Sequence, residues 1–132
     1  MYRPDLYRFV SACLVFIASF SLLSMQNPDL SASIKWENLI YDAGQVKHKQ
    51  PLKINFNFSN NSMVPLVILS VKTSCGCTVA DYPKEPIMPG KSGAISVTFD
   101  AEDIGYFHKQ VSVNSNTSEG TTFLEIKGEV IK

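Results

Sequence analysis

Apolar and polar residues alternate along most of the chain from Ile34 to its C-terminal end. Residues 51–58 show the pattern most clearly, because Lys53, Asn55 and Asn57 separate apolar side chains at every second position. Side chains of a β-strand point alternately to its two faces, so this pattern indicates strands with one buried face and one wet face. Strands are predicted in this way over residues 34–46, 51–58, 66–72, 78–82, 93–99, 107–114 and 123–131.

Turn-forming residues separate these segments, and no window has the apolar period of a helix. Pro89 and Gly90 are predicted to form the centre of a type II turn, in which proline sets φ and glycine accepts a positive φ. Gly105 closes another predicted turn, just before the strand over residues 107–114. Short strands at this spacing predict an all-β domain over residues 34–132, an antiparallel β-sandwich of about seven strands with Trp36 packed inward.

The first residues of the chain differ from the rest in composition. Arg3 and Arg8 precede an apolar run over residues 9–23, whose length matches the hydrophobic region of a secretory signal, about 7–15 residues. A membrane-spanning helix needs about 20 apolar residues. Residues 1–24 are therefore predicted to be a signal peptide or a short signal anchor, with residues 9–25 as a membrane tether if they are not cleaved. Cys13 resembles a lipoprotein site, but most of the apolar run follows it. We expect an exported protein, periplasmic or secreted.

Charge and motif content narrow the function classes. The chain has 12 basic and 12 acidic residues and a formal net charge of zero. A chain with no basic face is not expected to bind nucleic acid, and only its N-terminal segment is expected to touch a membrane. Hydrolase and phosphate-binding motifs are absent from the sequence, so we expect a non-catalytic protein.

Several short motifs occur in order along the predicted domain. They are Phe56-x-Phe58-x-Asn60, Ser74-Cys75-Gly76-Cys77-Thr78, Pro89-Gly90-x-x-Gly93, Gly105-x-Phe107-x-Lys109 and Val113-x-Ser115-Asn116. Together they resemble the exported bacterial family catalogued as domain of unknown function 1573, and the Cys-Gly-Cys element is the specific part. The resemblance implies an immunoglobulin-like sandwich, related in architecture to major-sperm-protein and Hydin-type domains, with no established activity. Ser62 stands where the family usually has glycine, so we expect the turn after Asn60 to be built differently.

Cys75 and Cys77 are the candidate reactive residues, and three interpretations of them stay open. Alternate Cα atoms of a strand lie about 6.6–6.8 Å apart, whereas a disulfide usually needs about 4.4–6.8 Å. A bond between these cysteines would therefore be strained and easily reduced, and either incidental or redox-active rather than stabilising. Two thiolates also suit Cu(I), and Zn²⁺ would need further ligands. In the third interpretation both cysteines fill a tight corner as small buried residues, and Gly76 permits the bend.

Two histidines are weaker candidate metal ligands. If the strands alternate in direction, His48 and His108 fall at the same pole of the domain as the two cysteines. The favoured interpretation of His48 is a solvated loop residue, and that of His108 is an outward-facing strand residue. Met63 and Met88 are interpreted as gap-fillers rather than copper ligands. No cofactor is predicted apart from this Cu(I) or zinc alternative.

The function favoured by these observations is a protein-interaction or structural module of the cell envelope, with another envelope protein as its partner. Edge strands of a sandwich can pair with an extended segment through main-chain hydrogen bonds. Residues 34–46 and 123–131 are the predicted edges. The alternative function is a soft-metal-binding or thiol–disulfide redox protein that uses Cys75 and Cys77.

Overall fold

The structure is a computed structural model, and it describes residues 30–74, 76 and 78–132. These residues form eight strands: β1 (Ile34–Trp36), β2 (Ile40–Lys47), β3 (Leu52–Asn60), β4 (Ile68–Thr73), β5 (Thr78–Asp81), β6 (Ser92–Phe99), β7 (Gly105–Ser115) and β8 (Thr121–Ile131). Within the described ranges, no helix has the length and apolar character needed to cross a membrane. The predicted signal segment, residues 1–24, lies outside these ranges.

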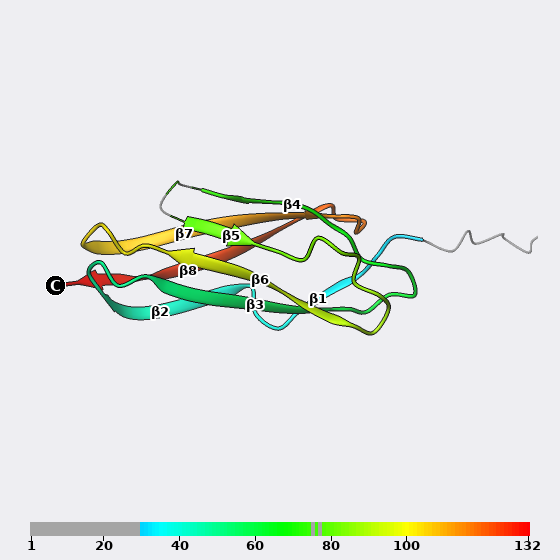
Figure 1. Ribbon diagram of the computed structural model, residues 1–132, viewed down its shortest axis with the longest axis horizontal. Coiled ribbons are helices and arrows are strands. Elements are labelled where there is room, and N and C mark those ends of the chain that lie inside the picture. The colour runs from blue at the N-terminus through cyan, green and yellow to red at the C-terminus, as the bar shows by residue number, and fades with distance from the viewer. Residues whose placement is uncertain (1–29, 75, 77) are drawn as a thin grey trace, which may run out of the picture.

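The strands form two sheets of four, which pack face to face as a sandwich (Figure 1). The strand order is β1-β3-β6-β5 in the first sheet and β2-β8-β7-β4 in the second. This order corresponds to the constant-type immunoglobulin arrangement of four strands facing three, with the first strand divided between the two sheets. The predicted all-β sandwich is confirmed, and the seven predicted segments correspond to eight strands.

The prediction of a single strand over residues 34–46 is wrong. It forms β1 in the first sheet and β2 in the second, because the chain crosses between the sheets at residues 37–39. The crossover does not reverse the chain, and β2 therefore runs parallel to β8, from Ile40 opposite Glu125 to Lys47 opposite Ile131. This parallel pair departs from the wholly antiparallel sandwich that the sequence predicts.

The hydrophobic core lies between the two sheets and consists of the inward-facing residues of the long strands. Its members include Ile54, Phe56, Phe58, Leu66, Ile68, Ile95, Val97, Val111, Val113, Leu124 and Ile126, all buried. Burial of each such side chain contributes about 1.5–3 kcal/mol of hydrophobic free energy. Trp36 packs against Phe58 with the ring centroids 5.1 Å apart, which confirms its predicted inward orientation.

The two ends of the sandwich are built from different loops (Figure 1). At the N-terminal pole, where Leu30 lies, are the β3–β4 loop (61–67), the β5–β6 loop (82–91) and the β7–β8 turn (116–120). Ala32 N donates a 3.3 Å hydrogen bond to Asn116 O there. The C-terminal pole comprises the β2–β3 turn (48–51), the β6–β7 loop (100–104) and Lys132, and Lys49 N donates to Ala101 O.

Candidate functional site

The Cys-Gly-Cys motif joins β4 to β5, which are the edge strands of the two sheets. Cys75 and Cys77 themselves lie outside the described residues, so their interpretation as a redox or metal pair stays a prediction. The residues that flank them are fixed by hydrogen bonds. Thr73 Oγ1 donates to Thr78 O at 3.0 Å, and Ser74 N donates to Gln110 O at 2.9 Å. The residues on both sides of the two cysteines are thus held by hydrogen bonds of their own.

Gly76 is the one motif residue between the cysteines, and it is exposed. Its φ does not lie in the left-handed region, and a Cβ built on it would meet no atom within 4 Å. Neither backbone conformation nor crowding therefore requires glycine at this position. The interpretation of Gly76 as the residue that permits a sharp corner stays a prediction, because Cys75 and Cys77 on either side of it lie outside the described residues.

The two candidate histidines make separate interactions. His48 Nε2 lies 2.8 Å from the backbone oxygen of Glu102 in the β6–β7 loop. His108 Nε2 lies 3.0 Å from Glu125 Oε2 on the outer face of the second sheet. His48 N also donates to Ile131 O, and Glu125 lies six positions before Ile131 on β8, about 20 Å away.

The structure therefore does not bring the two imidazoles together. Among the described residues, no group of three or more His, Cys, Asp or Glu side chains could hold a metal ion. His108 points outward, as an exposed strand residue does.

The predicted type II turn is confirmed. Lys91 N donates to Met88 O at 3.0 Å, which closes the four-residue turn around Pro89 and Gly90. Gly90 has φ +75°, the value that the third position of this turn requires. Gly105 likewise has a positive φ, +121°, at the first residue of β7.

Asn60 is the polar residue whose role the sequence motifs did not predict. It is buried, and its Nδ2 donates to Val64 O at 2.7 Å and to Ile87 O at 2.8 Å. Its Oδ1 accepts from Ser62 N at 2.9 Å and from Ser62 Oγ at 2.6 Å. The signal was present in the sequence, because Asn60 continues the inward-facing series of residues 54, 56 and 58. A polar residue in that series needs internal partners.

Four of the described strands lie at sheet edges, and they differ in how well each edge is protected against pairing with another strand. β1 and β5 have only three and four residues. β2 is interrupted by a bulge between Asp42 and Gln45. β4 has six residues, and its irregularity lies at its start, between Ile68 and Ser70. Short edges and bulges are the devices that prevent unwanted strand pairing, so β4 is the least protected edge.

The segment over residues 123–131, predicted as an edge, is not one. β8 occupies it and pairs with β2 on one side and β7 on the other. The prediction is wrong because the first segment switches sheets and β2 takes the outer position.

A comparison with protein-family models matches residues 34–130 to the family described as "Protein of unknown function (DUF1573)". The chain belongs to the DUF1573 family. The resemblance seen in the motifs is thus confirmed. A comparison with curated proteins gives no match.

Solved structures similar to this DUF1573 domain share its architecture. A protein of unknown function from Porphyromonas gingivalis W83 has a TM-score of 0.69 and 19% identity, and the match covers 83% of this chain and 51% of that one. The Vibrio cholerae VesB protease has a TM-score of 0.62 and 13% identity, with 76% and 32% covered. The ASH / PapD-like domain of human CEP192 (PapD-like domain 7) has a TM-score of 0.61 and 10% identity, with 84% and 94% covered.

These likenesses concern the fold. The DUF1573 chain spans about half the length of the Porphyromonas protein and about a third of the protease. It spans nearly the whole PapD-like domain. At identities below 20% the three structures show a shared PapD-like, immunoglobulin-like sandwich.

Proposed function

We propose that the protein is a non-catalytic interaction module of the bacterial cell envelope, and that it binds an extended segment of a partner protein along β4. The observation that carries the proposal is the open side of this strand. Within the described part of the chain, β4 pairs only with β7, and no strand follows it in the sheet. An extended peptide can add to such an edge through main-chain hydrogen bonds.

The register identifies the backbone groups available to a partner. Ser74 N bonds to Gln110 O of β7. In an antiparallel pair, hydrogen-bonded positions alternate with positions that point away. Lys72 and Ser70 therefore bond toward β7, and the N–H and C=O of Val71 point toward the open side.

Two side-chain features support the choice of β4. Leu69 is 56% exposed, and an apolar side chain beside an open edge offers a partner strand a contact surface. Asn116 holds the start of the strand in place, because its Oδ1 accepts from Val67 N at 2.8 Å and its Nδ2 donates to Pro65 O at 3.0 Å. A preformed edge of this kind reduces the ordering cost of binding.

The envelope location rests on the N-terminal apolar run over residues 9–23, which follows two arginines as in a secretory segment. The partner proposed is therefore another envelope protein that offers an extended segment. Lys72, exposed on the outer face of β4, favours a partner segment with an acidic residue.

Photo-crosslinking in the cell envelope tests the proposal. Benzoylphenylalanine is introduced at Leu69 on the edge or, as the matched control, at Phe123, which is 53% exposed on the central strand β8 of the same sheet. We expect a crosslinked partner from position 69 and none from position 123. Equal crosslinking from both positions would show that no edge-specific contact exists.

A backbone variant then separates strand addition from side-chain contact. Val71→Pro removes the outward N–H without removing a bond to β7, since proline is tolerated where the strand N–H faces solvent. Val71→Ala keeps this N–H and removes only the side chain. The crosslink from position 69 should disappear in Val71→Pro and persist in Val71→Ala, with both variants checked for cooperative thermal unfolding. Persistence in a folded Val71→Pro protein contradicts strand addition.

A further inference from the structure

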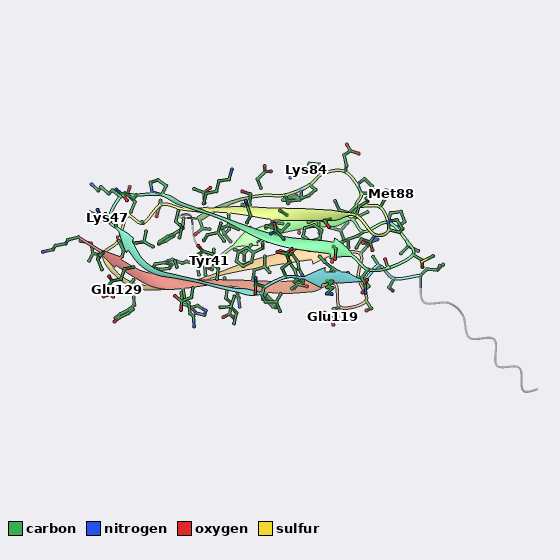
Figure 2. The ribbon with its side chains drawn as sticks, turned by 90° about the horizontal axis from the view of Figure 1, so that it is seen from below. Tyr41, Lys47, Lys84, Met88, Glu119 and Glu129 are labelled. Atoms are coloured by element: carbon green, nitrogen blue, oxygen red, sulfur yellow. The ribbon has the colours of Figure 1, made fainter. Side chains whose placement is uncertain are left out.

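The two poles of the sandwich differ in where their charges lie: at the N-terminal pole the charged residues Lys84, Glu85, Lys91 and Glu119 occupy the outer parts of the β5–β6 loop and the β7–β8 turn. The C-terminal pole is lined by charged residues of two loops and their flanks: Lys47, Lys49, Lys53, Asp100, Glu102 and Asp103. At the N-terminal pole, residues 30–34, 60–68 and 86–90 contain no charged residue. Figure 2 shows Lys47 and Glu129 at the end opposite to Met88, and Lys84 and Glu119 on the two flanks of the sandwich.

Exposed apolar side chains lie on the uncharged segments of the N-terminal pole, and Ile104 and Tyr106 are exposed at the opposite pole. Met63 is 92% exposed, Leu30 74% and Met88 54%. The interpretation of Met63 and Met88 as gap-fillers is therefore wrong, because their loops hold them outside the core. Clustered apolar side chains on an otherwise polar domain mark a contact with another apolar phase or partner.

The sequence before the described residues limits what this pole can meet. Residues 9–23 form the apolar run, and only residues 24–29 separate it from Leu30. Six extended residues span at most about 20 Å. Ala32 is fixed to the sandwich by its bond to Asn116 O and its bridge with Thr117. The N-terminal pole therefore lies within about 20 Å of the end of the apolar run.

The length of that run brings the pole closer still. A helix of fifteen residues would be about 22 Å long, whereas the hydrocarbon core of a bilayer is about 30 Å thick. An apolar segment that is too short draws its flanking residues toward the membrane or thins the bilayer locally. Either response moves Leu30 and the uncharged parts of the two loops, residues 60–68 and 86–90, to the membrane surface.

We propose that Leu30, Met63 and Met88 insert into the interface of the lipid bilayer that holds the uncleaved N-terminal segment. The sandwich then stands on its N-terminal pole. Its C-terminal pole faces away, and β8, with 11 residues, spans about 36 Å between the two ends. The inference rests on the envelope location proposed above but not on the β4 edge, so either can fail alone.

Depth-dependent quenching tests this orientation. The full chain is reconstituted in vesicles of phosphatidylethanolamine and phosphatidylglycerol with brominated acyl chains. Two reporters are compared in a Trp36→Phe background: Met63→Trp at the N-terminal pole, and Tyr106→Trp, an exposed position beside the β6–β7 loop at the opposite pole. We expect a blue shift and a loss of fluorescence for Met63→Trp and neither change for Tyr106→Trp.

A charged variant isolates the contribution of the pole. Adding Met88→Glu to the Met63→Trp protein should abolish the quenching while the protein stays with the vesicles in a flotation gradient. Equal quenching at both reporters means that the domain lies on its side. Absence of quenching at both reporters means that the N-terminal pole stays in water. Each result overturns the proposal, as does N-terminal sequencing of the cellular protein that shows cleavage after the apolar run.

Discussion

Asn60 Nδ2 donates a 2.8 Å hydrogen bond to the carbonyl oxygen of Ile87, 27 residues further along the chain. The backbone of Asn60 joins the same two loops, because its N donates to Lys91 O at 2.8 Å and its O accepts from Gly90 N at 3.0 Å. One buried amide therefore fixes the β3–β4 loop against the β5–β6 loop. These are the loops that carry Met63 and Met88.

Replacement of Asn60 by aspartate should destabilise the domain strongly. Asn60→Asp removes the two hydrogen bonds to Val64 O and Ile87 O and places a carboxylate against both carbonyl oxygens. An uncompensated buried charge costs about 3–5 kcal/mol, and we expect a decrease of that size in the free energy of unfolding in urea.

Ser62→Ala is the matched control for this network. It keeps the N–H that donates to Asn60 Oδ1 and removes only the hydroxyl, which donates to Asn60 Oδ1 and contacts Val64 O at 3.0 Å. A loss of about 1 kcal/mol is expected, the net value of a hydrogen bond. If Asn60→Asp cost no more than this control, the buried network would not be the source of stability.

The turn after Asn60 shows how much of the local structure could be predicted from the sequence. Ser62 departs from the family pattern, and the expectation that the turn is built differently is met in a specific way. The serine contributes its backbone N–H and its hydroxyl to Asn60 Oδ1, whereas glycine could contribute only the N–H. The sequence predicted that something differs, and side-chain geometry was needed to say what.

Addition of one methyl group at Gly93 should also destabilise the fold. Gly93 lies opposite Phe58 in the β3–β6 pair, and a Cβ on it would lie 2.8 Å from Phe58 Cζ and 3.3 Å from Ile87 Cδ1. Overpacking a core typically costs about 1–3 kcal/mol. Gly93→Ala should lower the free energy of unfolding by this amount.

Two further variants test the cause. Gly76→Ala, in open space, should leave stability unchanged to within about 0.5 kcal/mol, as surface substitutions do. Phe58→Leu should reduce the additional cost of Gly93→Ala in a double-mutant cycle. Additive effects of the two substitutions would mean that the methyl group does not clash with the Phe58 ring.

Loss of the Asn116 side chain should loosen the start of β4. Its amide group replaces a strand partner for residues 65–67, through Val67 N and Pro65 O. Asn116→Ala should therefore increase amide hydrogen exchange at Val67 while Val113, buried in the neighbouring strand, keeps its protection. Unchanged exchange at Val67 would show that the backbone bond from Asn116 N to Val67 O, 3.2 Å, is sufficient to hold the strand.

The strand segments and the core were predictable because each depends on local alternation. The alternation of apolar and polar residues places Ile54, Phe56 and Phe58 on one face of β3, and all three are buried. The sheet switch at residues 37–39 was not predictable in this way, because the partner of Ile40 is Glu125, far along the chain. The residue type of Met63 did not predict its exposure either. It follows from the turn that Asn60 and Ser62 build.

The Cys-Gly-Cys motif should contribute little to stability. The Thr73–Thr78 and Ser74–Gln110 hydrogen bonds hold its flanks without any sulfur atom. A disulfide between alternate residues closes a three-residue loop, worth about 1.6 kcal/mol at most in chain entropy. Cys75→Ser/Cys77→Ser should therefore unfold cooperatively, with a free energy of unfolding lower than that of the parent by no more than this amount.

Thr73→Val serves as the comparison, because it removes the hydroxyl that donates to Thr78 O and leaves both cysteines in place. Intact mass before and after reduction shows whether the parent pair is bonded, and metal analysis of protein purified without chelators shows whether it retains copper or zinc. A double serine variant that fails to fold, or loses much more than about 1.6 kcal/mol, would assign the motif a structural role that its flanking contacts do not explain. Retained copper that disappears in the same variant would instead support the soft-metal interpretation of the two thiols.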